Sequence, residues 1–148
     1  MQMFEVYTDG ACRNNPGPGG WGVVVKYGDQ KYVLSGGELL TTNNRMELIA
    51  VIKALDAISA GSNIVITTDS KYVKDGITSW INNWKINNWK TASGQAVKNK
   101  DLWMQLDNMV RQHVVAWKWV KGHSGHIEND LADQLARDAI DCVLAKGV

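Results

Sequence analysis

The stretch Asn63-Ile64-Val65-Ile66-Thr67-Thr68 decides the fold class of this 148-residue chain. It is a short apolar run, which predicts a buried strand. A helical pattern precedes it, with apolar residues at helical spacing from Met46 to Ala57, and Ser70 behind it can cap a short helix running toward Trp80. Strands joined through helices run parallel, so the stretch predicts an α/β layered domain.

The first forty residues predict β structure of another kind. Residues 4–9 alternate between apolar and polar side chains, residues 14–20 carry both prolines and three glycines of a turn, and residues 21–25 and 31–35 predict two more strands. Short connections of this kind favour an antiparallel meander, so the whole sheet should be mixed.

Helix and strand patterns continue to the C-terminus. Asn43-Asn44 offers side chains that could cap the helix before Gly61, residues 101–111 form a helical pattern, and residues 113–120 alternate like a strand. A loop at 121–126 precedes a final helix. The predicted order is β-β-β-α-β-α-α-β-α.

Composition fits one globular domain over residues 1–148, with 45% hydrophobic and 21% charged residues. No apolar run approaches the roughly 20 residues that span a bilayer, and the N-terminus lacks a signal-peptide pattern. Two cysteines outside any C-x-x-C spacing indicate free thiols in a reducing cytoplasm. Nothing indicates an obligate interface, so we expect a monomer without a membrane partner.

The net charge of +1 is unevenly distributed. Residues 71–100 carry six lysines against Asp75 alone, for a net +5, whereas residues 1–70 and 101–148 each carry −2. A local basic patch favours a polyanionic partner. From the charge alone, a solvated lysine-rich face is the better explanation.

Four acids could form one metal site. Asp9 is expected to end the first strand and Asp69 the fourth, while Glu47 and Asp133 lie near the starts of two helices. Ligands of α/β sheets bind at the carboxyl ends of strands, and an all-carboxylate site suits Mg²⁺ or Mn²⁺. Two such ions support phosphodiester cleavage.

Each acid also has a structural reading. Asp9 could serve a turn, Glu47 lies three residues after Asn44 as in a capping box, and Asp69 could cap a helix. Asp133 could pair with Arg137 at i+4. The residues alone therefore indicate only metal-dependent phosphotransfer.

Five segments in order resemble the bacterial ribonuclease HI family, over nearly the whole chain: residues 7–22, 41–48, 68–73, 120–125 and 129–133. The resemblance implies a mixed five-stranded sheet with helices on both faces. It implies an endonuclease that hydrolyses the RNA strand of RNA–DNA hybrids with Mg²⁺ or Mn²⁺, two ions being bound with substrate, and leaves 5′-phosphate and 3′-hydroxyl ends. The family's catalytic and metal-binding acids fall on Asp9, Glu47, Asp69 and Asp133.

Further roles follow from the resemblance, position by position. His123 matches a catalytic histidine, for which we expect proton transfer or product release and no metal binding. The matched substrate contacts are Cys12, Asn15, Thr42, Asn43, Asn44, Trp80, Trp84, Lys85 and Asn99. Thr42 and Asn99 resemble a pocket for a DNA-strand phosphate, but the arginine of that pocket aligns with Leu40.

Residues 80–100, here called the handle, match the basic protrusion with which the family grips the hybrid. They contain a tandem pentapeptide, Ile81-Asn82-Asn83-Trp84-Lys85 and Ile86-Asn87-Asn88-Trp89-Lys90. Aromatic rings can stack on sugars or bases and lysines neutralise phosphates, although tryptophans that merely pack the helix would look the same. This handle has fewer basic residues than the family pattern, which predicts weaker hybrid binding.

Two other functions remain open at this stage. The acidic cluster also occurs in DNA exonucleases, resolvases and integrases of the same fold. The third possibility is a non-catalytic nucleic-acid module. The presence of all four acids argues against it.

Overall fold

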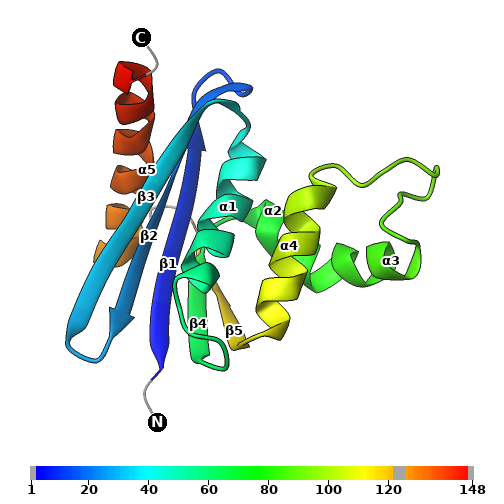
Figure 1. The fold of residues 1–148 in the computed structure, drawn as a ribbon, viewed down its shortest axis with the longest axis horizontal. Coiled ribbons are helices and arrows are strands. Elements are labelled where there is room, and N and C mark those ends of the chain that lie inside the picture. Colours follow the sequence, from blue (N-terminus) through cyan, green and yellow to red (C-terminus); the bar gives the residue numbers. More distant parts are fainter. Residues whose placement is uncertain (1–2, 122–125, 147–148) are drawn as a thin grey trace.

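A computed structural model describes residues 3–121 and 126–146. Five strands form one sheet in the order β3-β2-β1-β4-β5 (Figure 1). They are β1 Phe4–Cys12, β2 Gly17–Tyr27, β3 Gln30–Thr41, β4 Asn63–Thr68 and β5 Val114–Trp119. The helices are α1 Asn43–Asp56, α2 Lys71–Asp75, the π-helical turn η1 Gly76–Trp80, α3 Ile81–Ile86, α4 Lys100–Arg111 and α5 Ile127–Lys146.

The mixed sheet is confirmed. β1 pairs antiparallel with β2, and β2 antiparallel with β3, which is the expected meander. β4 lies parallel between β1 and β5. The apolar run that predicted a buried strand is therefore the second-to-last strand of the sheet, with Ile64 and Ile66 in the core.

Helices cover both faces of the sheet, as the resemblance implied (Figure 1). α1 packs on one face and α4 packs on α1, and their buried side chains include Leu48, Leu55, Trp103 and Leu106. α5 packs on the other face through small residues such as Ala132 and Ala136. Among the described residues, no helix is long and apolar enough to cross a bilayer.

The expected turn at 14–20 is shorter than predicted, because β2 already begins at Gly17. Two glycines near the start of β2 lie directly under α5. A Cβ at Gly20 would overlap the Ala136 carbonyl, and one at Gly22 would overlap the Ala132 carbonyl. Gly20, which looks like a turn residue, is thus a strand residue that lets the helix approach. β3 is likewise longer than predicted and extends to Thr41.

Helix ends differ in detail from the prediction. Thr42, rather than Asn43 or Asn44, caps α1, since its Oγ1 accepts a hydrogen bond from the Arg45 backbone N–H at 3.2 Å. α1 ends at Asp56, before Gly61. The predicted cap of α2 is confirmed: Ser70 Oγ accepts from the Val73 N–H at 3.1 Å.

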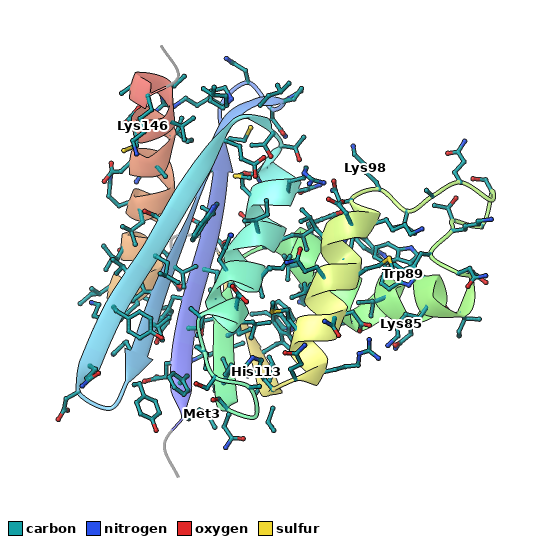
Figure 2. All side chains as sticks on the ribbon, viewed as in Figure 1. Met3, Lys85, Trp89, Lys98, His113 and Lys146 are labelled. Carbon is teal, nitrogen blue, oxygen red and sulfur yellow. The ribbon has the colours of Figure 1, made fainter. Side chains whose placement is uncertain are left out.

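The handle projects away from the sheet (Figure 1). α3 forms its first part, and the segment up to α4 carries Asn88 and Trp89 in left-handed conformation, with φ of 56° and 60°. Lys85, Trp89 and Lys98 all lie on this projecting part, far from Lys146 on α5 (Figure 2).

Candidate active site

Three carboxylates converge where the parallel pairing of β1 and β4 ends. Asp9, Glu47 and Asp69 place ligand oxygens within 4.8 Å of one another. Asp9 does not end its strand as predicted, because β1 continues to Cys12 along β2. The parallel pairing with β4, however, ends at Tyr7 and Thr67. Asp9 and Asp69 each lie two residues beyond that pair, so the expected meeting of the two acids is confirmed.

Glu47 reaches the cluster from α1. Its side chain is buried, and Oε1 accepts from the Gly10 N–H at 3.3 Å. A Cβ at Gly10 would lie 2.5 Å from the Glu47 backbone nitrogen, so glycine at this position lets α1 sit directly on β1. The capping-box reading of Glu47 is wrong, since Thr42 caps the helix.

Asp133 completes the acidic group from α5. It lines the same cleft as the other three acids, and its proximity raises the pKa of Asp9. It also forms the predicted i+4 ion pair with Arg137, at 2.7 Å. The structural and the catalytic readings of Asp133 are therefore compatible.

The cluster strongly disfavours ionisation of Asp9 and Glu47. Burial, then the charge of Asp69 and the proximity of Asp133, raise the pKa of Asp9 from 3.8 to about 8, against a smaller opposing hydrogen bond from Gly10. Burial followed by the charges of Asp9 and Asp69 raises the pKa of Glu47 well above its usual value. Such a group of acids needs either protons or a cation.

A divalent cation fits these residues. All the converging donors are hard carboxylate oxygens, which Mg²⁺ and Mn²⁺ prefer. Glu47 Oε2 is buried and has no hydrogen-bond partner among the described residues. A buried oxygen without a partner is costly unless a ligand satisfies it.

The acids line a cleft of about 430 Å³. Asn43 and Asn44 from the start of α1 lie on its wall, as the resemblance implied for substrate contacts. Sequence reasoning missed several further lining residues, namely Lys71, Tyr72, Lys121, Asn129 and Asp130. All five belong to the quoted motifs, but only the fold places them at the cleft.

Asn15 and Cys12 support the asparagine wall. Asn15 Oδ1 accepts from the Asn43 backbone N–H at 3.0 Å, which ties the β1–β2 turn to α1. The Cys12 thiol donates to the Thr41 carbonyl at 3.5 Å, and burial raises its pKa. Cys12 is free, and so is Cys142.

Thr42 and Asn99 are linked by a residue that the sequence did not single out. Arg45 donates through Nη1 to Asn99 Oδ1 at 3.2 Å and forms an ion pair with Asp101 at 2.9 Å. Leu40, which replaces the pocket's arginine, is 75% exposed. The nearby positive charge therefore comes from Arg45.

Trp80 and Trp84 belong to an aromatic cluster that joins the cleft to the handle. Tyr72, which lines the cleft, contacts Trp80 edge to face at 5.8 Å, and Trp80 contacts Trp84 at 5.7 Å. Lys85 pairs with Asp107 at 3.4 Å, so part of the handle's charge is neutralised within the chain. His123 lies outside the described residues.

A mixed sheet covered by helices, with clustered carboxylates at the strand ends, is the arrangement of a metal-dependent nuclease. The ribonuclease H family model matches residues 1–141. The chain is 57% identical to ribonuclease H of Hydrogenovibrio crunogenus over 95% of this chain and 97% of the relative. It is 60% identical to that of Alcanivorax borkumensis over 95% and 93%. The chain belongs to the ribonuclease H family.

Solved structures show the same fold. LC9-RNase H1, a type 1 enzyme with the type 2 active-site motif, superposes with a TM-score of 0.86 at 37% identity, over 95% of this chain and 73% of that one. LC11-RNase H1, solved in complex with an RNA/DNA hybrid, gives 0.72 at 23% identity over 95% and 99%. The second likeness concerns the fold alone.

Proposed function

We propose that this protein is an endonuclease that hydrolyses the RNA strand of RNA–DNA hybrids, leaving 5′-phosphate and 3′-hydroxyl ends. The observation that carries the proposal is the convergence of Asp9, Glu47 and Asp69 within 4.8 Å in a cleft walled by asparagines. Membership of the ribonuclease H family supports this substrate over DNA.

Asp9, Glu47, Asp69 and Asp133 would hold the metal. We propose Mg²⁺, with Mn²⁺ as a substitute and two ions when substrate is bound. The bound metal supplies an activated water and charge stabilisation at the leaving oxygen.

The side chains prepare this chemistry. The Gly10 N–H orients Glu47 through Oε1, which leaves Oε2 directed to a ligand. With a pKa of about 8, Asp9 carries a proton at neutral pH in the free protein and must release it when the site is loaded. His123 is assigned proton transfer or product release, roles that an imidazole side chain can serve.

Substrate selection is assigned to the residues around the cleft. We propose that Asn15, Asn43 and Asn44 read the minor groove and the RNA 2′-hydroxyl, which distinguishes RNA from DNA, and that Cys12 lies close to the substrate. Thr42 and Asn99 would hold a DNA-strand phosphate beside the Arg45 guanidinium. Trp80, Trp84 and Lys85 would guide the DNA strand along the handle.

We further propose that residues 1–148 act as one domain, with residues 80–100 as its handle, and as a monomer in the cytoplasm. Two free cysteines support a reducing compartment.

The decisive assay incubates the protein with an RNA–DNA hybrid, double-stranded DNA and double-stranded RNA, with Mg²⁺ or with EDTA. We expect cleavage of the hybrid's RNA strand only, abolished by EDTA and by Asp9→Asn. Asp29→Asn removes an equal charge in the exposed β2–β3 turn and should leave cleavage unchanged. Metal-independent cleavage, or equal attack on DNA, would falsify the proposal.

A further inference from the structure

The basic patch of the sequence divides into two places in the structure. Lys85 belongs to the handle and pairs with Asp107. Lys71 and Lys74, by contrast, lie on α2, directly after the catalytic Asp69. Lys121 joins them from the segment after β5, fifty residues along the chain from Lys71.

These three lysines line a groove of about 460 Å³, here called the lysine groove. Its other lining residues are Thr68, Asp69, Ser70, Asp75, Trp119 and Val120. Asp69, Ser70, Lys71 and Lys121 also line the catalytic cleft. The groove therefore begins at a catalytic carboxylate and leads away from it between α2 and the end of β5.

Local structure fixes the walls of the groove. Ser70 caps α2, and the buried Val73 anchors it, which leaves Lys71 and Lys74 exposed at an i,i+3 spacing on one helix face. The Val120 N–H donates to the Thr68 carbonyl at 3.1 Å and holds the other wall beside β4. Trp119, stacked on Trp117 at 5.2 Å, gives that wall a rigid side.

The charges in the groove are available to a ligand. Within residues 3–121 and 126–146, none of the three lysines forms an ion pair, whereas Lys26, Lys85 and Arg45 do. The acids of the lining are Asp69, which belongs to the metal site, and Asp75. Lysine ammonium groups beside a phosphodiester-cleaving site suit phosphate oxygens.

We propose that the lysine groove is a backbone subsite that binds a phosphate of the RNA-containing strand next to the cleaved linkage. The inference rests on the proposed function, because it takes the strand that crosses the acids to be the cleaved one. The strand that reaches Asp69 continues over the lysines on the far side of that residue. The groove would then hold the cleaved strand while the handle holds the other.

A charge-deletion cycle tests the subsite. The substrate is a hybrid whose cleaved strand has a short ribonucleotide block within DNA, which fixes the cleavage position. Single neutral methylphosphonate linkages are placed at successive positions on both sides of the block, and separately in the complementary strand. kcat/KM is measured for the wild type, Lys74→Gln, Lys74→Arg and the control Lys31→Gln, whose lysine lies at the start of β3.

Lys74 lines the groove but not the catalytic cleft, so its charge can be deleted apart from the chemistry. A phosphate contact contributes about 0.9 to the slope of log affinity against log salt. One contact therefore strengthens binding at 0.1 M salt about eightfold relative to 1 M salt. We expect one neutral linkage in the cleaved strand to lower wild-type kcat/KM by about that factor. In Lys74→Gln the same linkage should hardly lower kcat/KM. In Lys74→Arg and Lys31→Gln it should lower kcat/KM by the same factor as in the wild type.

Equal losses in the wild type and Lys74→Gln at every position would overturn the subsite. Coupling confined to the complementary strand would overturn its assignment to the RNA-containing strand. A wild type that cleaves the unmodified hybrid while showing no coupling leaves the proposed function standing. A wild type that cleaves no hybrid overturns both.

Discussion

Replacing Asp9 with asparagine should stabilise the metal-free protein, and the gain should grow with pH. The pKa of Asp9 is raised to about 8 by burial and by the neighbouring acids Asp69 and Asp133. In the unfolded chain the same carboxyl titrates near 3.8. Between these values the folded state binds a proton that the unfolded state has released, so raising the pH lowers the free energy of unfolding.

The expected change in the free energy of unfolding follows from the pH range between the unfolded and folded pKa values of Asp9. Each pH unit between about 4 and 8 lowers wild-type stability by up to about 1.4 kcal/mol through this group. The difference in the free energy of unfolding between Asp9→Asn and wild type, here called the gap, should therefore widen by up to about 2.7 kcal/mol between pH 5 and pH 7. The gap should level off above about pH 8, where Asp9 is ionised in both states. Removing Asp9 also relieves Glu47, whose pKa it helps to raise.

Urea unfolding in EDTA, followed by tryptophan fluorescence at each pH, measures the gap. Asp29→Asn is the matched control, because it removes the same charge from an exposed turn. Adding Mg²⁺ at pH 8 should stabilise the wild type and have a smaller effect on Asp9→Asn, since binding to the folded state adds to its stability.

Two results would refute this reasoning. A gap between Asp9→Asn and wild type that stays constant from pH 5 to pH 8 would mean that Asp9 titrates normally in the fold. Equal stabilisation of both proteins by Mg²⁺ would show that Asp9 does not bind the metal.

Two further predictions concern η1 and the handle that follows it. Gly76→Ala should lower the free energy of unfolding by about 3 kcal/mol, because a Cβ there would overlap the buried Trp103 indole; a loss below 1 kcal/mol in urea unfolding would contradict this. Ile86→Lys with Asn87→Lys should tighten hybrid binding and steepen its salt slope by up to about 1.8, and an unchanged slope would contradict it. Position 88 is avoided, since its φ of 56° suits asparagine better than lysine.

The acidic site could be predicted in large part from the sequence. An apolar strand ending at Thr68 places Asp69 at a sheet edge, and parallel pairing brings Asp9 there as well. The prediction did not include the course of β1 beyond Asp9, because Gly17, Gly19 and Gly20 of β2 resemble a turn in the sequence. Only their tertiary contacts, such as that of Gly20 with α5, explain why a strand carries glycine there. Arg45 beside Asn99 was missed for a similar reason, as 54 residues separate the two partners.

The handle separates local from tertiary information most clearly. Its two pentapeptides are identical in sequence, yet the first is helical and the second turns through left-handed Asn88 and Trp89. Ile81 is 7% exposed and packed in the core, whereas its counterpart Ile86 is 81% exposed. Identical local preferences cannot distinguish the copies, so their positions relative to the core do.

The sequence by itself determined the fold class, the order of the strands and the residues able to bind a divalent metal, since these depend on periodicity and side-chain chemistry; it did not predict η1 and α3 as separate helical elements. Only the tertiary structure decided which charges act together. In the sequence Lys71 and Lys74 belong with Lys85, but the fold places them with Lys121 beside Asp69 and pairs Lys85 with Asp107. The physical reason is that electrostatic interactions depend on distance in space, and sequence separation leaves that distance open.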